Sequence, residues 1–359
     1  MTITLWLRAE TGADERRTPL TPSDAARLVE DGFSIMVEES AERVFADAAY
    51  AAAGCRLVPP GSWTVAPDDA FILGIKELPT EPAALRHRHV YFAHAYKEQS
   101  GWRQLLGRFV AGGGQLLDLE YLTDASGARV AAFGYWAGFA GAALGVRLWA
   151  GRQREGSEFK MSAQRPAADQ NELVSAIRTR LELIPEDRAR QPKSIIIGAL
   201  GRSGRGASAL FDALGMEATG WDVAETAGGG PFPELLDYDL LVNTVLLGAP
   251  IPPFLTRAEI AREDRRLAVI ADVSCDPSSA ANPLPIYERV TSFAEPAVRV
   301  IEGDNPLDIV AVDNLPSLLP RESSIDFSSQ LLPHLAALRE GSDVWRRAID
   351  AFTEHCARL

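Results

Sequence analysis

Short apolar runs alternate with amphipathic segments along the first third of the chain. The apolar runs predict strands over Ile3–Arg8, Phe33–Val37, Ala70–Gly74, Val90–Ala93 and Gln115–Asp118. The segments between them predict helices over Thr21–Asp31, Asp47–Ala53 and Gly101–Ala111. Such regular alternation is typical of a parallel sheet that is covered on both faces.

A second series of the same kind occupies the later part of the chain. It comprises predicted helices over Asn171–Leu183 and Arg205–Leu214 and predicted strands over Ser194–Ile197, Leu240–Thr244, Leu267–Asp272 and Ile309–Asp313. The last segment, Asp326–Leu359, is mostly helical in pattern and has no strand partner, so we expect it to return to the first series. The sequence therefore predicts an α/β fold of two Rossmann-like, doubly wound domains with mainly parallel sheets and a cleft between them. The expected domains are residues 1–131 with 325–359, and residues 132–324.

One apolar run links the two series. Val130–Val146 carries no charge and contains two Gly-x-x-x-Gly spacings, which suit close helix packing. At 17 residues, bounded by Arg129 and Arg147, it is short for a bilayer span. We expect a buried helix whose glycines let a neighbouring backbone approach closely, and no membrane segment.

Composition narrows the class of partner. The 359-residue chain is 47% hydrophobic and 24% charged, as in an ordinary globular protein, and its net charge of −13 argues against nucleic acid and anionic membranes. Cys55, Cys275 and Cys356 lie far apart, which predicts neither a disulfide framework nor a zinc site and fits a reducing compartment. The N-terminus becomes charged too early for a signal peptide, so we expect a cytoplasmic protein that acts on small molecules.

Lysine is scarce in this chain: four lysines accompany thirty-two arginines. Lys76 and Lys97 lie in one short segment that also holds His87, His89 and His94. An arginine cannot release its proton near neutral pH, whereas a desolvated lysine can. A lysine kept in so arginine-rich a chain is therefore a candidate proton carrier. His87 and His89 belong to a charged Arg-His-Arg-His stretch, which we interpret as a solvent-exposed turn.

The sharpest local motif follows the strand Ser194–Ile197. Gly198, Gly201 and Gly204 stand between this strand and a helix, an arrangement that lets the backbone approach a pyrophosphate at the helix N-terminus. Asp222 lies about twenty residues further on, where a carboxylate receives the adenosine ribose and repels a 2′-phosphate. The motif therefore predicts NAD rather than NADP. Later strand ends place Val273 and Leu315 where the nicotinamide ring is expected.

Several ionisable residues follow the strands of the first series. Lys76 and Glu77 come after one strand, His94 and Lys97 after the next, and Glu120 after a third. The carboxyl ends of parallel strands meet at one edge of a sheet, so we expect these side chains to share a site. Arg16, Arg17 and Arg129 are expected near the same edge.

The chain resembles a known family, the NAD-dependent saccharopine dehydrogenases that form L-lysine. This family is related to alanine dehydrogenase and to the nucleotide-binding subunit of transhydrogenase. The resemblance runs through LRAET, GIKELP, FAHAYKEQSGW, DLEYL, RVAAFGYWAGFAGAALGVR, IIGALGRSGRG, GGPFPELL, ADVSCD, NPLPIY, DNLPSLLPRESS and HCARL. It implies oxidation of saccharopine by NAD to an imine, which water splits into lysine and 2-oxoglutarate. The fungal members imply a monomer, whereas the alanine dehydrogenase relatives argue for an oligomer.

The resemblance also implies roles for individual residues. Lys76 matches the general base, His94 the acid–base group for the water steps, and Glu77 and Glu120 the carboxylates that temper the positive charge of the site. The matching substrate-binding positions are Arg17, Lys97, Gln99, Arg129 and Phe133. The matching cofactor-binding positions are Gly198, Gly201, Arg202, Ser203, Asp222, Thr226, Val273, Asp313 and Leu315. No metal is implied.

The chain also departs from the fungal members. It has Gly12, Ser203 and Asn314 where they carry lysine, cysteine and histidine. With Gly12 the chain lacks one positive charge that could bind the substrate. The resemblance therefore supports the 2-oxoglutarate half of the substrate more strongly than the amino-donor half. Two other hypotheses stay open: an opine-type or alanine-dehydrogenase-like oxidoreductase with a different substrate pair, and a dinucleotide sensor without turnover.

Overall fold

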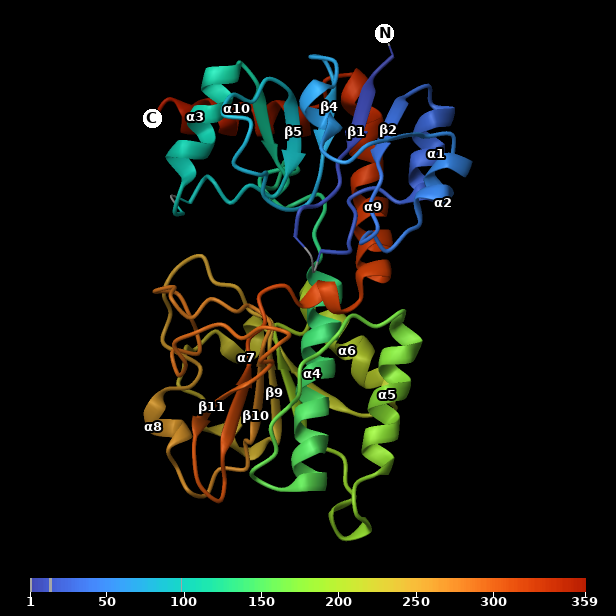
Figure 1. The fold of residues 1–359 in the computed structure, drawn as a ribbon. Coiled ribbons are helices and arrows are strands. Elements are labelled where there is room, and N and C mark those ends of the chain that lie inside the picture. The colour runs from blue at the N-terminus through green and yellow to red at the C-terminus, as the bar shows by residue number, and fades with distance from the viewer. Residues whose placement is uncertain (1, 13–14, 98) are drawn as a thin grey trace. The chain divides into compact units, whose positions relative to one another are not determined.

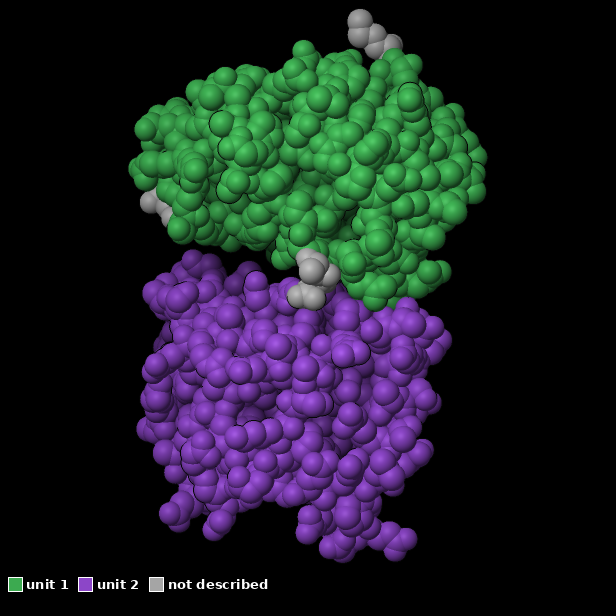
Figure 2. All heavy atoms as spheres, in the orientation of Figure 1, with its two compact units in different colours: residues 1–133, 320–359 green, residues 134–319 purple. Residues whose placement is uncertain are grey.

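The computed structural model describes residues 2–12, 15–97 and 99–359. These residues form two compact units, one of residues 1–133 with 320–359 and one of residues 134–319, which Figure 2 shows in two colours. Each unit contains a six-stranded, mainly parallel sheet, so the predicted α/β class is confirmed (Figure 1).

The sheet of the first unit is entirely parallel, with the strand order β3-β2-β1-β4-β5-β6. Its strands are β1 (Thr4–Leu7), β2 (Ser34–Glu38), β3 (Arg56–Val58), β4 (Phe71–Leu73), β5 (Arg88–Tyr91) and β6 (Gln115–Asp118). Side chains alternate between the two faces, so that Leu5 and Leu7 join one buried cluster and Trp6 joins the other. Both faces are therefore apolar and need covering helices.

Helices from both ends of the chain cover this sheet. They are α1 (Pro22–Glu30), α2 (Asp47–Ala52), α3 (Trp102–Gly112), α9 (Pro320–Ala336) and α10 (Asp343–Cys356). Thr21 caps α1, and Pro22 occupies its first turn, as the sequence predicts. The Ser324 and Ser328 hydroxyls of α9 accept hydrogen bonds from the Thr18 and Thr21 amides at 2.9 and 3.0 Å. The C-terminal segment thus returns to the first unit, as expected.

The sheet of the second unit has the order β11-β12-β10-β9-β7-β8. Its strands are β7 (Ser194–Ile197), β8 (Ala218–Trp221), β9 (Leu240–Asn243), β10 (Val269–Asp272), β11 (Val298–Ile301) and β12 (Leu307–Val310). Only β11 runs antiparallel, beside β12 at the edge of the described sheet. This strand was not predicted, and neither were β3 and β8. The side chains of β11 are only half-buried, and Arg299 interrupts its short run of apolar residues.

The two faces of this second sheet are covered differently. One face packs against the long helices α4 (Gly134–Glu155), α5 (Gln170–Glu182) and α6 (Arg202–Leu214). The other face carries mostly loops with the short helices α7 (Val223–Thr226) and α8 (Arg257–Ile260), and its core includes Phe254, Leu284 and Tyr287. This stretch of the chain contains many prolines, which interrupt helices because they lack the amide hydrogen.

The predicted buried helix is α4, and its glycines do allow close approach. A side chain at Gly138 would overlap the carbonyl group of Ser203 on α6, and one at Gly206 would overlap the carbonyl of Tyr135 on α4. The helix starts at Gly134 and ends at Glu155, later at both ends than the apolar run. Among the described residues, no helix is long and apolar enough to cross a membrane.

The interpretation of His87 and His89 as exposed is wrong. Both are buried, at 1% and 0% exposure, while the alternating Arg86 and Arg88 are exposed. The Arg-His-Arg-His stretch leads into β5, so its alternation is the period-two pattern of a strand. His89 packs against the rings of Trp63 and Phe109, and burial lowers the pKa of its imidazole well below the usual value.

We predict that Gly206→Ala destabilises the protein. The new methyl group would meet the Tyr135 carbonyl carbon at 2.7 Å, so α4 and α6 must separate, at a cost of about 1–3 kcal/mol. Chemical denaturation measures the free energy of unfolding. Gly107→Ala in α3 is the control: a side chain there has no neighbour within 4 Å, and helix propensity predicts a gain of up to about 1 kcal/mol. Equal effects of the two substitutions would contradict the close packing.

Candidate active site

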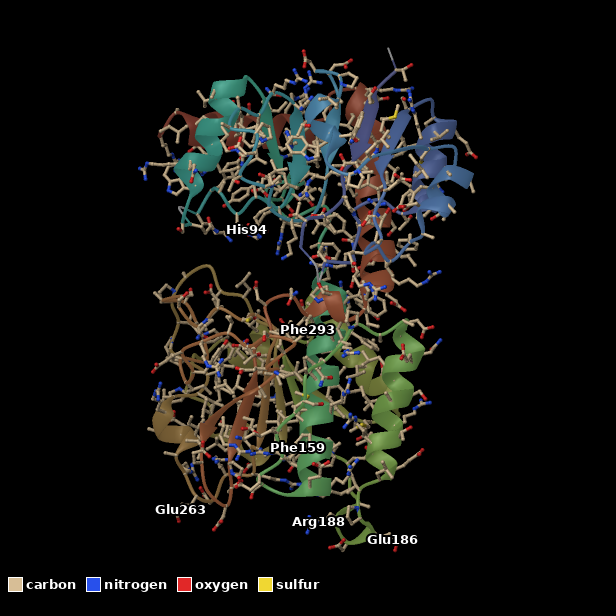
Figure 3. The ribbon with its side chains drawn as sticks, in the orientation of Figure 1. His94, Phe159, Glu186, Arg188, Glu263 and Phe293 are labelled. Carbon is tan, nitrogen blue, oxygen red and sulfur yellow. The ribbon has the colours of Figure 1, made fainter. Side chains whose placement is uncertain are left out.

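Four strand ends of the first unit bring the ionisable residues to one edge of the sheet. β1 leads into Arg8 and Glu10, β4 into Lys76 and Glu77, β5 into His94, and β6 into Glu120. Because all these strands are parallel, their carboxyl ends lie at the same edge. Figure 3 shows His94 beyond the end of β5.

His94 lies between two carboxylates. Its Nε2 is 3.8 Å from Glu77 Oε1 and its Nδ1 is 3.7 Å from Glu120 Oε2. Interaction with Glu120 raises the pKa of His94 most, and Glu77 adds to it, although partial burial opposes both. In return, the pairing with His94, helped by Lys97, lowers the pKa of Glu120 to about 2. The imidazole is therefore biased toward its protonated form beside a permanently ionised carboxylate.

The backbone of His94 is also unusual. Its φ of +51° is in the left-handed region, which residues other than glycine seldom adopt. Strained residues of this kind are concentrated at functional sites, where the surroundings hold them in place.

The substrate-binding positions predicted on this edge have different environments. Lys97 forms a 2.7 Å ion pair with Glu120, and Gln99 Oε1 accepts a hydrogen bond from the Lys97 amide at 3.0 Å. The Arg129 side chain is exposed, and its charge helps to lower the pKa of Glu120. Of these groups, Arg129 is the cation that makes no ion pair with another described residue, and so it is available to an anionic ligand.

Arg17 already has a carboxylate partner within the chain. Its Nε and Nη2 donate to the two oxygens of Glu15 at 2.8 and 2.6 Å, and both side chains are buried. The guanidinium lies 4.5 Å from the centre of the Phe133 ring, which stacks on Phe327 at 4.3 Å. Burial raises the pKa of Glu15, but the bonds from Arg17 and the charges of Arg17 and Lys76 outweigh it and leave that pKa below the usual value.

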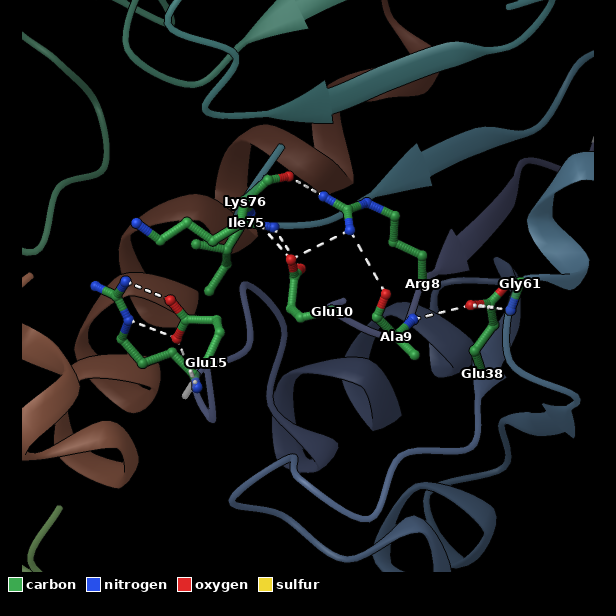
Figure 4. A network of polar contacts seen from close by, with 9 residues as sticks. Arg8, Ala9, Glu10, Glu15, Glu38, Gly61, Ile75 and Lys76 are labelled. Carbon is green, nitrogen blue, oxygen red and sulfur yellow. Dashed lines mark hydrogen bonds and ion pairs between the residues drawn. The ribbon is translucent and has the colours of Figure 1, made fainter. Parts of the chain in front are cut away.

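A buried ion pair holds the turn that carries Lys76 (Figure 4). The Glu10 oxygens accept hydrogen bonds from the Ile75 and Lys76 amides at 2.7 and 3.0 Å. Arg8 pairs with Glu10 at 3.1 Å and also donates to the Lys76 carbonyl. The Lys76 peptide groups are thus bound on both sides, while its half-buried side chain extends away from Glu10 toward Glu15.

A second buried carboxylate lies under the His94–Glu120 pair. Asp118 Oδ1 accepts a hydrogen bond from the Glu120 amide at 2.9 Å, whereas its Oδ2 has no partner among the described residues. Burial raises the pKa of Asp118 to about 6. Asp118 therefore fixes the start of the loop that carries Glu120.

The second unit presents the glycine turn between β7 and α6. Gly198 has a φ of +82°, and a side chain there would meet the Thr244 hydroxyl at 2.7 Å. A side chain at Gly204 would overlap the Gly198 carbonyl. Gly201 is the N-cap of α6, and no side chain of a described residue caps this end. The first amides of α6, from Arg202 and Ser203 onward, are therefore free to face an anion, as a pyrophosphate requires.

Asp222 lies at the end of β8, beside this turn. Its Oδ2 accepts a hydrogen bond from the Leu200 amide at 2.8 Å, and its Oδ1 accepts one from the Val223 amide at 2.9 Å. The Thr226 hydroxyl donates to the Asp222 carbonyl at 2.8 Å. The carboxylate is thus fixed against the glycine turn and retains further acceptor capacity for hydroxyl groups.

The remaining cofactor positions follow the central strands. Val273 comes directly after β10, and its amide donates to the Asn243 carbonyl at 2.8 Å. Asp313 is exposed beyond β12, and Leu315 is buried two residues later. All these positions lie on the carboxyl side of the parallel strands β7, β9, β10 and β12.

Four residues that shape the first edge were not predicted as site residues. Arg8, Glu10, Glu15 and Asp118 act on backbone groups or on other side chains, so no spacing of chemically reactive residues reveals them. Their one available signal is position: Arg8, Glu10 and Asp118 are charged residues at or directly after the ends of apolar strands.

Comparison with known proteins identifies the family. The saccharopine dehydrogenase (NAD+, L-lysine-forming) of Candida albicans is 44% identical over 374 residues, spanning 99% of this chain and 98% of that protein. The enzymes of the same name from Emericella nidulans and Schizosaccharomyces pombe are also 44% identical, over 99% and 96% of this chain and 98% and 96% of those proteins. The chain belongs to the saccharopine dehydrogenase (L-lysine-forming) family.

Broader comparisons agree with this assignment. Residues 6–140 match the family model for the alanine dehydrogenase/PNT N-terminal domain. Among solved structures, an L-alanine dehydrogenase aligns over 98% of this chain and 94% of its own, with a TM-score of 0.68 at 18% identity. The transhydrogenase from Sinorhizobium meliloti aligns over 96% and 97%, with a TM-score of 0.63 at 16% identity. At this level of identity the two structures support the fold alone.

We predict that Glu120→Gln lowers the pKa of His94, because it removes the carboxylate that stabilises the imidazolium most. The imidazolium would then be lost at a lower pH than in the native chain. An NMR titration of the imidazole measures this, with the signal assigned by a His94→Gln variant.

Glu77→Gln is the matched control. Its side chain is 60% exposed, against 18% for Glu120, so solvent screens its charge more and the fall should be smaller. An unchanged His94 pKa in Glu120→Gln, or a larger fall in Glu77→Gln, would contradict the assignment.

Proposed function

We propose that the chain is an NAD-dependent saccharopine dehydrogenase. It oxidises the secondary amine of saccharopine to an imine, and water splits this imine into L-lysine and 2-oxoglutarate. The reverse reaction condenses the two products reductively. The observation that carries the proposal is the sheet edge of the first unit in a chain 44% identical to enzymes of this name. There an imidazole lies between two carboxylates, and Lys76 follows the end of the neighbouring strand β4.

Lys76 is the general base in this proposal. Oxidation of a secondary amine requires removal of its proton as hydride leaves the neighbouring carbon. Lys76 is half-buried, and the Arg8–Glu10 pair fixes its backbone, so the base is presented from a rigid turn. Rigid presentation matters because catalysis depends strongly on the distance and angle of proton transfer.

His94 serves the water steps. Addition of water to the imine needs a base, and collapse of the resulting carbinolamine needs an acid. An imidazole ordinarily titrates close to neutral pH, which suits it to both steps. The pairing with Glu120 and Glu77 raises the pKa of His94 and so favours the imidazolium that acts as the acid. Glu120 stays ionised throughout, since its own pKa is about 2.

The substrate carboxylates need cationic partners. The guanidinium group of Arg129 has no partner among the described residues, and its two parallel N–H donors suit a carboxylate. Lys97 is close enough to Arg129 for the two charges to interact, and both charges act on Glu120. Gln99 orders the loop that carries Lys97. Because its fork is bound to Glu15, Arg17 positions Phe133 as an apolar wall of the substrate site through the 4.5 Å contact.

The structure of the glycine turn between β7 and α6 fits NAD. A pyrophosphate fits the closely packed backbone at Gly198 and Gly204 and the start of α6, which no described side chain caps. The ribose diol fits the fixed carboxylate of Asp222. Val273, Asp313 and Leu315 follow strands at the same side and would hold the nicotinamide end. When bound, NAD accepts the hydride from the substrate carbon. Asp222 disfavours a 2′-phosphate and so favours NAD over NADP.

An assay of NADH consumption with different amino acids tests the amino-donor half of the substrate. The native chain should consume NADH with 2-oxoglutarate and lysine. Lys76→Met should lower this turnover by roughly two to four orders of magnitude, the scale expected for a general base, and leave NADH binding near normal. NADH fluorescence measures the binding separately from turnover.

Lys193→Met is the control variant, since Lys193 is an exposed lysine of the second unit and should leave turnover unchanged. Turnover with another amino acid but not with lysine would show that the substrate is a different secondary amine and not saccharopine. Native-like turnover in Lys76→Met would refute the base assignment.

A further inference from the structure

A cationic pocket in the second unit belongs to neither the proposed substrate residues nor the glycine turn. It has a volume of about 240 Å³ and lies between α4, α5 and the segment that follows α4. Arg147 of α4, Arg180 of α5 and Lys160 of the connecting segment all line it. Three positive side chains from three segments converge here, in a chain whose net charge is −13.

The two arginines lack partners within the chain. Among residues 2–12, 15–97 and 99–359, neither guanidinium forms a hydrogen bond or an ion pair, and both side chains are half-buried. Burial, and then the like charge of Arg180, lower the pKa of Arg147 to about 10. The one carboxylate that lines the pocket, Glu155, is already paired with Arg154 at 3.2 Å. The pocket therefore contains positive charge that the protein itself does not compensate.

Gln164 provides a second, independent sign of a ligand. This side chain lines the pocket and is only 7% exposed. Its Nε2 donates to the Ser162 carbonyl at 2.5 Å, whereas its Oε1 is buried without a partner in the described chain. Buried polar atoms are nearly always hydrogen-bonded, so an unpaired amide oxygen of a residue that lines the same pocket as two unpaired guanidinium groups indicates a missing polar partner with a donor.

The wall that carries these groups is a fixed part of the fold. The Phe159 ring lies directly against the backbone of Gly151, so that no side chain would fit there, and Figure 3 shows Phe159 beside the later part of α4. The Gln164 amide donates to the Phe293 carbonyl at 2.7 Å. These contacts anchor both ends of the segment that carries Lys160 and Ser162.

A neighbouring pocket makes the contrast clear. It is larger, about 470 Å³, and it also contains arginines. Arg299 is paired there with Asp308 at 3.0 Å, and Arg289 with Glu295 at 3.6 Å. Lys160 lines this pocket too, but the lining also holds the carboxylates of Glu158, Glu295, Glu302 and Asp308. Acidic groups therefore outnumber the cations, and the pocket shows no need for an anion.

We propose that the pocket of Arg147, Arg180 and Lys160 binds a phosphate group, carried by a small phosphomonoester. Guanidinium groups bind phosphate oxygens in bidentate fashion, and a tetrahedral dianion can be reached from three directions at once, as the three cations require. A planar carboxylate is satisfied by one such fork. The ester's hydroxyl groups supply the donor that the Gln164 oxygen lacks, and the volume leaves room for a small organic group but not for a dinucleotide.

The test is a calorimetric titration of the full chain with glycerol 3-phosphate, inorganic phosphate and succinate. The native chain should bind glycerol 3-phosphate saturably, and Arg180→Gln and Lys160→Gln should each weaken this binding about tenfold. Arg178→Gln is the control, because it removes the same charge from the same helix outside the pocket and should leave binding unchanged. Thermal unfolding of each variant verifies that it is folded, and the exposed loop residue Lys160 keeps the test valid if a helix variant is not.

Each titration is repeated with saturating NADH, which separates this site from the glycine turn. Binding at the proposed pocket is sensitive to Arg180 and independent of NADH. Tighter binding of glycerol 3-phosphate than of phosphate identifies the ester as the ligand, and equal binding identifies free phosphate; both support the phosphate site. Absence of saturable binding, tighter binding of succinate, equal losses in Arg178→Gln and Arg180→Gln, or competition with NADH would overturn it.

Discussion

The buried pair of Arg8 and Glu10 is the constraint on which the chemistry of the first unit depends. Glu10 binds two successive amides of the turn after β4, and Arg8 binds the carbonyl of the same turn, so Lys76 is held from both sides of its backbone. The guanidinium lies so close to Gly74 that a side chain there would meet its Cζ atom at 2.6 Å. Burial raises the pKa of Glu10, and the charge of Arg8 and the hydrogen bonds from the two amides oppose this rise. Removing one partner would leave the other charge buried and unpaired, which is the costly case for buried ions.

The same design recurs along the sheet edges. Asp118 fixes the Glu120 loop through one amide. Glu38 accepts hydrogen bonds from the Ala9 and Trp63 amides at 2.9 and 2.7 Å and so orders the start of the loop after β1. In the second unit, buried Asp272 binds the Asn243 amide group and the Tyr287 hydroxyl at 2.9 and 2.7 Å. Carboxylates that are bound to backbone or neutral groups place the strand-end loops, while the reacting groups Lys76 and His94 remain half-exposed at the edge.

The sequence predicted what depends on periodicity and on specific local motifs. The parallel strands, the buried glycine helix and the glycine turn were found because apolar runs and glycine spacings are local signals. The strand β11 and the burial of His87 and His89 were missed for different reasons. The side chains of β11 are only half-buried and Arg299 interrupts its apolar residues, whereas the two histidines are polar residues at inward positions of an alternating pattern. The role of Glu10 could not be predicted, because the amides that it binds lie 65 and 66 residues further along the chain. Glu15 pairs with Arg17 only two residues away, but the fold alone shows that this pair is buried. The sequence likewise cannot show that the guanidinium groups of Arg147 and Arg180 are unpaired, because this depends on where the neighbouring carboxylates lie in the fold.

A double-mutant cycle between Glu10 and Lys76 tests most directly whether the clamp acts through the base. Turnover is measured with NADH, 2-oxoglutarate and lysine for Glu10→Gln in the native chain and in the Lys76→Met background, and NADH fluorescence verifies binding in each. If Glu10 positions Lys76, its loss should lower turnover about ten- to a hundredfold in the native chain and less than about twofold when Lys76 is already gone. An equal loss in both backgrounds would show that Glu10 acts independently of Lys76 and would contradict the central claim.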